Sequence, residues 1–414
     1  MRRTLLKLSH YKLTFESSCS IVWEIKRLMN YDFPEIKTIQ DVLPHIEGCT
    51  EFRVMEKDWY SVVNYMVSLE ETFRWDSDDP VGSTVRRECR GLIFNREGEL
   101  VSRPYHKFFN VGEKEETQLN KVNLYEPHVV LEKLDGSMIR PIPTPEGFRL
   151  ATKAGVTDVA MNAEVFIADK PHYATFIRKC FQRNTTPIFE WCSRANRIVV
   201  DYPEDQLILT AMRYVFEGSY VTYEIMKSYA TAWNIPVVQA VDGLAVQNID
   251  LFVKQVREWD DGEGIVLRFD TGHMVKVKAD DYVLRHKSKD AINQEKNVIQ
   301  TILEDAVDDL IPLLTPEDAQ RVESFQTAFW VSVDDFASEM ADLYNAGNLM
   351  YPEKKDFAVE FVQKKILPIH APIMYGMKVG KGAKNVIVDM ISKSLSTQNK
   401  LDENRWLFGG IKWN

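Results

Sequence analysis

The chain has 414 residues, of which 45% are hydrophobic and 27% are charged, so it is long enough for two or three domains with substantial cores. Its formal net charge of −10 argues against a general nucleic-acid coat protein, because non-specific binding depends on many lysine and arginine contacts to phosphate. Any nucleic-acid site must therefore be local.

The composition also predicts the compartment. No apolar stretch approaches the roughly 18 residues of a membrane span, and the opening MRRTLLKLSHYKL has too short an apolar segment for a secretory signal. The five cysteines are odd in number and form no C-x-x-C pair, so they indicate neither a disulfide framework nor a structural zinc site. We therefore expect a cytoplasmic protein with reduced cysteines and no membrane contact.

Between about Glu88 and Tyr282, short apolar segments alternate with turn signals, which predicts strands joined in hairpins. Two helical stretches interrupt these strands. One begins at Thr157 or Asp158, both plausible N-caps, and the other begins near Asp250. The predicted hairpins pair residues 91–95 with 100–102 and 138–142 with 148–152, and a third hairpin spans residues 264–278.

After about His286 the strand pattern ends and the segments have helical periodicity, interrupted by prolines. The sequence therefore predicts an α+β domain over residues 1–287, which includes an N-terminal extension, and an all-α domain over residues 288–414. Charge is segregated within the second domain.

The charged segments at the end of the chain differ in sign. Residues 290–353 carry 2 basic and 14 acidic residues, whereas residues 354–414 carry 11 basic and 5 acidic residues. Charge runs usually form a solvated surface. An RNA-binding face is the alternative, favoured by the stretch KVGKGAK at Lys378 to Lys384, whose glycines can bring backbone N–H groups close to phosphate.

The stretch LEKLDGSMI places Lys133 at the end of an apolar run, directly before a turn that Gly136 would allow. A K-x-D-G match is weak by itself, because a lysine at the end of a strand is usually solvated. A free lysine titrates at about 10.4 and is a poor nucleophile at neutral pH, so a reactive lysine needs burial or nearby cations that lower its pKa.

The sequence supplies candidate cations. In the hairpin that ends MVKVK, strand alternation puts Lys276 and Lys278 on one face, where they either hold a phosphate or are solvated on a half-exposed strand. Arg90 in RECRG and Lys107 in HKFFN lie upstream, the latter beside Phe108 and Phe109. Separately, each of these residues is more often a surface charge or a core aromatic.

Three carboxylates are candidate metal ligands. Glu190 lies in the apolar stretch PIFEW, where a buried charge is costly unless it is paired or metal-bound. Glu263 opens the lysine-bearing hairpin, and Asp135 lies two residues after Lys133. Oxygen ligands that leave open positions suit Mg²⁺ with a nucleotide phosphate.

The motifs occur in the order RECRG, HKFFN, K-x-D-G-S, ATKAG, FEW, EGIV and K-V-K. This order resembles the covalent nucleotidyltransferase superfamily and, within it, the RNA ligase 1 family of tailed bacteriophages, the tRNA-repair type. The likeness runs from about Glu88 to His286, and a thinner one reaches DAVDDL at Asp305 to Leu310. It implies an α+β nucleotidyltransferase (ATP-grasp-like ligase) domain with antiparallel sheets, followed by an all-α domain concerned with RNA substrate choice.

The resemblance also implies roles. Lys133 would attack the α-phosphate of ATP and carry AMP, while Lys276 and Lys278 would bind that phosphate and lower the pKa of Lys133. Lys153 of ATKAG would assist the later steps. The remaining roles are triphosphate binding by Arg90 and Lys107, ribose and metal contacts by Glu190 and Glu263 with Asp135 as a further ligand, and pocket walls at Phe109 and Tyr282.

The implied activity is ATP-dependent joining of RNA 5′-phosphate and 3′-hydroxyl ends, with Mg²⁺ or Mn²⁺. The implied substrate is cleaved tRNA, and the enzyme would be a monomer in the cytoplasm of a phage-infected host. DNA ligases and capping guanylyltransferases share K-x-D-G but normally carry an OB-fold, which would appear as several short C-terminal strands. A non-catalytic RNA-binding relative is the other alternative, and only an enzyme would acquire covalent AMP.

Overall fold

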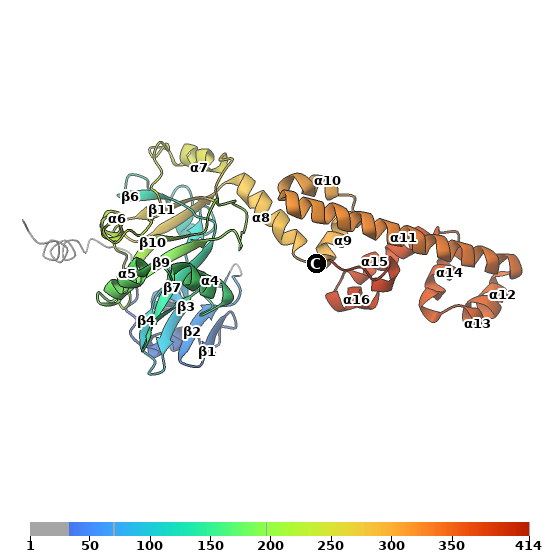
Figure 1. The fold of residues 1–414 in the computed structure, drawn as a ribbon, viewed down its shortest axis with the longest axis horizontal. Helices are drawn as coiled ribbons and strands as arrows, with labels where there is room; N and C mark the ends of the chain where they lie inside the picture. The colour runs from blue at the N-terminus through green and yellow to red at the C-terminus, as the bar shows by residue number, and fades with distance from the viewer. Residues whose placement is uncertain (1–32, 69–70, 196, 414) are drawn as a thin grey trace, which may run out of the picture. The chain divides into compact units, whose positions relative to one another are not determined.

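The computed structural model describes residues 33–68, 71–195 and 197–413 (Figure 1). The chain divides into two compact units, Met1–Ala279 and Asp280–Asn414. The domain boundary expected from the sequence, between residues 287 and 288, falls inside helix α8 (Asp280–Ile292) of the second unit. Most of the expected N-terminal extension and Cys19 lie outside the described residues, as does Asn196.

Three four-stranded sheets build the first unit, with strand orders β1-β2-β3-β4, β10-β9-β7-β8 and β5-β12-β11-β6. Neighbouring strands are antiparallel except β12 and β5, which are parallel. The strands are β1 (Phe52–Glu56), β2 (Tyr60–Tyr65), β3 (Arg90–Asn95), β4 (Leu100–Ser102), β5 (Phe109–Asn110), β6 (His128–Glu132), β7 (Ser137–Thr144), β8 (Gly147–Ala151), β9 (Thr185–Cys192), β10 (Gln206–Tyr214), β11 (Gly264–Phe269) and β12 (Met274–Lys278). The α+β class expected from the sequence is confirmed.

The predicted hairpins are confirmed as β3–β4, β7–β8 and β11–β12. In β12, Val275 and Val277 are almost fully buried in one core, and Lys276 and Lys278 lie on the opposite face, as strand alternation predicts. Local periodicity was sufficient here because the alternation of a strand does not depend on what packs against it.

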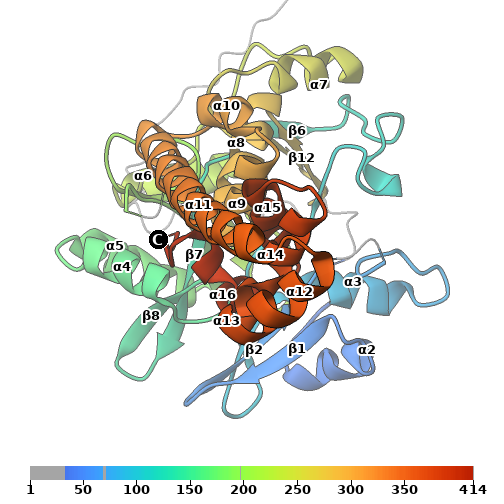
Figure 2. The same cartoon turned by 90° about the vertical axis from the view of Figure 1, so that its right-hand side faces the viewer.

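Helices cover the second sheet on one side. The predicted helices are α4 (Asp158–Ile167), capped by the Thr157 side chain, and α7 (Ile249–Arg257), which packs against β11 and β12 of the third sheet instead. The structure adds α5 (Pro171–Phe181) and α6 (Tyr223–Ala232), so the expectation of only two helical stretches was wrong. Helix α4 packs against β7 and β8, and α5 packs against β9; Figure 2 shows α4 and α5 together near β8.

The composition of α5 is ambiguous between a helix and a strand. Phe176 and Ile177 are buried, and with the rest of the helix they follow a 3.6-residue period, but the aromatic and β-branched side chains of PHYATFIRKCF also suit a strand. Shorter elements before β3 are η1 (Ile39–Asp41), α2 (Leu43–Ile46) and α3 (Pro80–Glu88), and η2 (Glu115–Thr117) follows β5.

The two faces of β9 lead into different environments. Phe189 and Trp191 pack into the core beneath the helices, whereas Ile188 joins Met274 and Val266 of the third sheet in a small core on the other face. Glu190, which is on the same face as Ile188, therefore looks toward the third sheet. The space between the second and third sheets is where the functional side chains meet.

The described part of the second unit contains helices and no strands. Helix α11 (Pro316–Met350) has 35 residues, and α9, α14 and α15 pack against it (Figure 1). The remaining elements are α9 (Glu295–Leu303), α10 (Val307–Leu310), η3 (Ile311–Leu313), α12 (Lys354–Asp356), η4 (Phe357–Val362), α13 (Gln363–Lys365), η5 (Pro368–His370), α14 (Ala371–Lys378), α15 (Ala383–Ser394), α16 (Gln398–Glu403) and η6 (Arg405–Phe408). An OB-fold, expected of DNA ligases and capping enzymes, does not occur among these residues. Across residues 33–68, 71–195 and 197–413, no helix combines the length and apolar character of a membrane span.

Candidate active site

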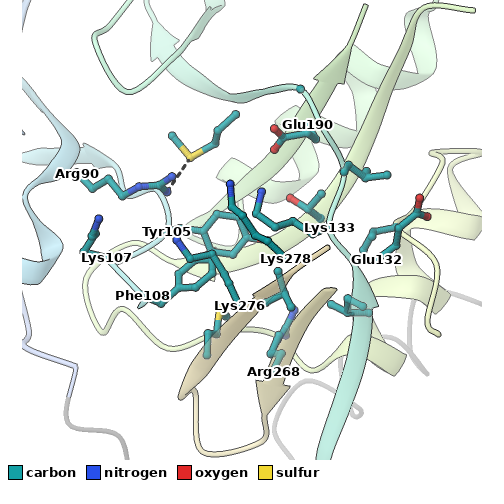
Figure 3. Close-up of a pocket in the computed structure, with 18 of the residues that line it drawn as sticks. Arg90, Tyr105, Lys107, Phe108, Glu132, Lys133, Glu190, Arg268, Lys276 and Lys278 are labelled. Atoms are coloured by element: carbon teal, nitrogen blue, oxygen red, sulfur yellow. Dashed lines mark hydrogen bonds between the residues drawn. The ribbon is translucent and has the colours of Figure 1, made fainter. Parts of the chain in front are cut away.

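Lys133 follows strand β6 at the edge of a cavity of about 290 Å³ in the first unit (Figure 3). Its backbone N–H donates to the carbonyl of Gly264 at 2.8 Å, so the end of β6 is tied to the start of β11. Leu131 and Leu134 on either side are buried, which fixes the direction in which the lysine leaves the sheet. The wall of the cavity consists of Tyr65, Arg90, Tyr105, Lys107, Phe108, Leu131, Glu132, Lys133, Leu134, Gly136, Met138, Glu190, Thr210, Val238, Val266, Arg268, Met274, Lys276 and Lys278.

Glycine is required at position 136 for close packing, whereas the sequence had suggested a turn. Its backbone φ is not in the left-handed region, so the turn itself does not require glycine. A Cβ atom at this position would instead lie 2.5 Å from the carbonyl oxygen of Trp191. Glycine therefore allows the K-x-D-G segment to pass directly against β9, which brings Lys133 close to Glu190 on the same strand.

Glu263 is the ion-pair partner of Lys133. One carboxylate oxygen of Glu263 lies 2.5 Å from the Lys133 Nζ atom, and the other lies 2.8 Å from the Nζ atom of Lys278. The Glu263 side chain is buried, and among the described residues no group of three or more His, Cys, Asp or Glu side chains gathers as a metal site. The carboxylate thus fixes two lysines side by side at the cavity.

Lys276 and Glu190 have the most displaced pKa values at this cavity. Burial lowers the pKa of Lys276 to about 7, and the neighbouring cations Lys133, Lys107 and Arg90 contribute in the same direction. Burial raises the pKa of Glu190 to about 7, against the opposing influence of Lys133. Figure 3 shows the side chains of Lys133, Lys276 and Lys278 converging on the space bordered by Arg90 and Glu190.

Tyr65 is surrounded by three of the predicted cations. The Nζ atoms of Lys107 and Lys153 lie 5.4 and 4.8 Å from the centre of its ring. Burial alone would raise the pKa of the Tyr65 phenol, but Arg90, Lys107 and Lys153 together lower it below its usual value. Lys153, which does not line the cavity itself, therefore belongs to the same cationic cluster as Arg90 and Lys107.

The backbone beside Arg90 is held by one buried arginine, Arg140. Arg140 is fully buried and donates through its two Nη atoms to the carbonyls of Gly91 and Thr152. Gly91, at φ +98°, lies so close to Lys153 that an added Cβ would come within 2.6 Å of the Lys153 carbonyl oxygen. This packing places Arg90 and Lys153 next to each other although they are far apart in sequence.

The glutamate of RECRG forms a second buried network. Glu88 pairs with Arg103 at 3.1 Å and with Arg213 at 2.7 Å, and all three side chains are buried. Burial raises the pKa of Glu88, but the two guanidinium groups outweigh that effect and bring it down to about 2. The residues of this network position the start of β3, where Arg90 lies.

Asp135 uses its carboxylate within the fold. The side chain is buried, and its Oδ2 atom accepts hydrogen bonds from the backbone N–H groups of Val199 and Val200 at 2.8 and 2.7 Å. Its own N–H donates to the Tyr202 hydroxyl. These contacts attach the K-x-D-G segment to the NRIV stretch, and Asp135 does not line the cavity.

Neither of the two predicted wall aromatics is among the residues that line the cavity. Phe109 is buried in a separate core of the first unit, and Phe108, one residue earlier, lines the cavity in its place. The centre of the Phe109 ring still lies 5.5 Å from the Lys107 Nζ atom, which is within the range of a cation–π interaction. Tyr282 belongs to α8 of the second unit, where its ring lies 5.8 Å from that of His286.

Several cavity residues carried no recognisable signal in the sequence. Tyr65 lies before the first motif, and Tyr105 lies between RECRG and HKFFN. Thr210 and Val238 lie in apolar stretches typical of a core. The sequence around Arg268 is typical of a solvated strand residue. Only for Arg268 could the alternation of β11 have helped, because it shares the face of Val266.

Comparison with known families identifies two matching domains. A model described as RNA ligase matches residues 88–291, and a model described as T4 RNA ligase 1, C-terminal domain, matches residues 289–401. Among curated proteins, one from Thermovibrio ammonificans described as "Putative RNA ligase" is 26% identical over 323 residues, covering 74% of this chain and 80% of that protein. RNA ligase 1 of bacteriophage TS2126 is 28% identical over 143 residues, covering 33% of this chain and 36% of that protein.

Solved structures of RNA ligases are also similar. A Naegleria gruberi RNA ligase mutant in the apo state matches with a TM-score of 0.38 and 16% identity, covering 45% of this chain and 58% of that chain. Another mutant of the Naegleria enzyme, solved with ATP and Mn, gives a TM-score of 0.35 and 16% identity over 41% and 54% of the two chains. An archaeal ATP-dependent RNA ligase has a TM-score of 0.40 and 13% identity, over 60% and 64%.

Proposed function

The chain belongs to the phage RNA ligase 1 family and is an ATP-dependent RNA ligase, and on that premise we propose that it seals cleaved tRNA through an AMP carried on Lys133. The observation that carries this assignment is the convergence of Lys133, the carboxylate of Glu190 and five further cations on one cavity. Lys133 borders the cavity, paired with Glu263 and facing Glu190. The further cations are Arg90, Lys107, Arg268, Lys276 and Lys278, and all but Arg268 are proposed to bind phosphate.

In the proposed first step, the Lys133 amine attacks the α-phosphate of ATP. An N–P bond forms, the P–O bond to pyrophosphate breaks, and Lys133 carries AMP. Lys276 and Lys278 would hold the α-phosphate, and Arg90 and Lys107 the β- and γ-phosphates. In-line displacement at phosphorus depends mainly on positioning and on stabilisation of charge, which is what converging cations supply.

Two further displacements complete the proposed reaction. An oxygen of the RNA 5′-phosphate attacks the phosphorus of lysyl-AMP and releases the Lys133 amine, which forms an RNA-adenylate. The RNA 3′-hydroxyl then attacks the activated 5′-phosphate and AMP leaves. Lys153, which lies beside Lys107 around Tyr65, would assist these later steps because its charge remains near the phosphates after pyrophosphate has left.

The carboxylates suit a hard divalent cation, which we propose to be Mg²⁺. Glu190 lines the cavity, and Glu263 does not line it but pairs with two lysines that do. Two protein carboxylates with phosphate oxygens and water are a usual Mg²⁺ coordination set. When bound, the ion would neutralise phosphate charge. The ion pairs of Glu263 with Lys133 and Lys278 support its proposed role, because both lysines line the cavity.

The second unit is proposed to select the RNA. Gly382 precedes α15 without a side-chain cap, and Lys381 and Lys384 flank it. Lys381 pairs with Asp389 at 3.0 Å and Lys384 with Asp334 at 2.6 Å, and these exposed pairs are worth little, so RNA phosphate can replace the carboxylates. Lys378, in contrast, donates to Asn348 and to the Pro352 carbonyl and is used inside the unit.

We further propose a monomer that acts in the cytoplasm of the infected host, where ATP and cleaved tRNA are both available. No described feature requires a second copy, because all proposed catalytic side chains come from the first unit. Sedimentation of the purified protein with and without RNA tests the monomer directly.

The decisive experiment incubates the protein with α-labelled ATP and Mg²⁺ and follows acid-labile AMP on the chain. Lys133→Ala should remove the label, while joining of RNA already adenylylated at its 5′ end should survive in part. Labelling of Lys133→Ala would refute the nucleophile. A panel of single-stranded RNA, nicked duplex and cleaved anticodon loops then tests the tRNA substrate.

The role of the second unit is tested on the same panel. Ending the chain after Ala279 should preserve AMP attachment and reduce the use of cleaved tRNA more than that of short single strands. Lys381→Ala with Lys384→Ala should reduce the salt slope of tRNA joining by about one per lysine. Lys364→Ala, which loses a comparable exposed pair to Glu360 on another helix, is the matched control.

A further inference from the structure

Arg268 lies on β11 at the end of the cavity that the phosphate chemistry does not use. Strand alternation places it on the same face as Val266, and both residues line the cavity. Figure 3 shows Arg268 on the far side of Lys276 from Arg90 and Lys107. The side chain is only 5% exposed, which is rare for an arginine without a carboxylate partner.

The hydrogen bonds of Arg268 are incomplete. Its Nη2 atom donates to the carbonyl of Val221. Its Nη1 atom is buried and finds no hydrogen-bond partner among the described residues, and no ion pair to a carboxylate is formed within residues 33–68, 71–195 and 197–413. A buried N–H without an acceptor is costly, so such a group in a cavity indicates an acceptor that arrives with a ligand.

The register of the β11–β12 hairpin gives the distance from the phosphate end. Gly264 pairs with Lys278, Val266 with Lys276 and Arg268 with Met274. Arg268 is therefore two residues beyond the level of Lys276, roughly 7 Å along the strand. A nucleotide whose α-phosphate lies at Lys276 and Lys278 has its ribose and base beyond that level.

The surface between these two levels suits a nucleobase. Leu131, Val266 and Val238 provide apolar walls, and the polar Thr210 side chain is already donating to the Ile188 carbonyl. A flat base would be stabilised by the apolar walls, but these walls do not distinguish one base from another. Within the described wall, Arg268 is the group with an unused donor at this end.

We propose that Arg268 is a base-binding residue that donates a hydrogen bond from Nη1 to a ring nitrogen of the bound adenine. This inference rests on the proposed function, because it takes the cavity as the ATP site. Adenine offers the acceptors N1, N3 and N7, whereas guanine carries an N–H donor at N1 and an amino group beside it. A fixed donor that contacts N1 therefore favours adenine over guanine. A donor that contacts N3 or N7 can bond both bases, and it then orients the base in the cavity.

The test measures AMP attachment with ATP and with its 1-deaza, 3-deaza and 7-deaza analogues, in which one ring nitrogen is replaced by C–H. One analogue should raise KM in the wild-type protein by roughly tenfold to a hundredfold, as expected for loss of a hydrogen bond from a charged donor. Arg268→Met should raise KM for ATP by a similar factor and should be insensitive to that same analogue. Met274→Leu, which changes the cavity wall without removing a donor, should keep the wild-type order of sensitivity to the three analogues, whatever its KM for ATP.

The outcomes separate the two proposals. If the wild-type protein acquires AMP but tolerates all three analogues equally, Arg268 meets no ring nitrogen and the inference is overturned, with the ligase function intact. The same conclusion follows if Arg268→Met remains sensitive to the critical analogue. If the wild-type protein acquires no AMP, the proposed function fails and the inference fails with it. The analogue series on the wild-type protein tests the proposal by itself, so the test remains valid if Arg268→Met does not fold.

Discussion

The Nζ atom of Lys133 lies 2.5 Å from a buried carboxylate oxygen of Glu263, although 130 residues separate them. The other oxygen of Glu263 holds Lys278. A single carboxylate therefore positions both the proposed nucleophile and one of the proposed phosphate ligands before any nucleotide binds. The ion pair therefore holds the Lys133 side chain in the orientation that faces the cavity.

Glu263→Gln should reduce AMP attachment by at least about tenfold, because a neutral amide holds the two ammonium groups less strongly than a charged carboxylate does. The rate of labelling from ATP in a single turnover is the measurement. Glu132→Gln is the matched control, since Glu132 lines the same cavity beside Lys133 without an ion pair among the described residues. Equal rates for the two variants would show that the Glu263 pair does not position Lys133.

ATP binding should take up a proton at Lys276. Burial and neighbouring cations bring the pKa of Lys276 to about 7, so the free side chain is mostly neutral at pH 8 and above. A bound phosphate favours the ammonium form, and the affinity for ATP should therefore fall as pH rises from 7 to 9, by at most about tenfold per pH unit.

Titration with a non-transferable α,β-methylene ATP in buffers of different ionisation enthalpy measures this proton directly. Lys276→Met should bind more weakly at pH 7 and show a flatter pH profile, whereas Lys278→Met, the control on the same strand face, should keep the wild-type slope. A wild-type affinity that is constant between pH 7 and 9 would contradict the assignment.

The requirement for metal should depend on the protonation of Glu190. Burial raises the pKa of this carboxyl to about 7, so it is largely protonated below pH 7 and must lose a proton to act as a ligand. The Mg²⁺ concentration for half-maximal AMP attachment should therefore rise as pH falls from 7 to 6, by up to about tenfold. Glu190→Gln should remove this pH dependence along with most of the activity, and a pH-independent midpoint in the wild-type protein would exclude a metal role.

Gly91→Ala should disturb Lys153 without unfolding the protein. Alanine at φ +98° costs about 1–2 kcal/mol in backbone strain, and its Cβ would also meet the Lys153 backbone at 2.6 Å. Gly243→Ala is the control, because Gly243 has φ +83° with no atom within 4 Å. Both variants should lower the thermal transition slightly, but only Gly91→Ala should slow sealing of pre-adenylylated RNA. Equal sealing rates would show that the Gly91 contact does not position Lys153.

Local patterns predicted the strand positions of several proposed site residues correctly. The alternation of MVKVK put Lys276 and Lys278 on one face, and the break of an apolar run placed Lys133 at the end of β6, because both depend only on the geometry of a single strand. The order of the motifs carried the family resemblance, since it reflects chemistry that is independent of the exact packing. The helical character of the second unit likewise followed from periodicity.

What the sequence could not decide was which side chains meet. Asp135 is only two residues from Lys133 but turns its carboxylate to the backbone of Val199 and Val200, whereas the distant Glu263 becomes the lysine's partner. Adjacent residues of a strand point to opposite faces, so the choice between Phe108 and Phe109 depended on how the third sheet packs. Tyr65 and Arg268 entered the site in the same way.

The physical reason is the same in each case. The composition and periodicity of the chain determined its elements, the faces of its strands and the chemical groups available for phosphate transfer. The packing of two sheets determined which of those faces enclose a cavity, and burial there moved the pKa values of Lys276 and Glu190 to about 7. Burial depends on contacts between residues far apart in sequence, so only the tertiary structure decided which charged groups are poised to change protonation near neutral pH.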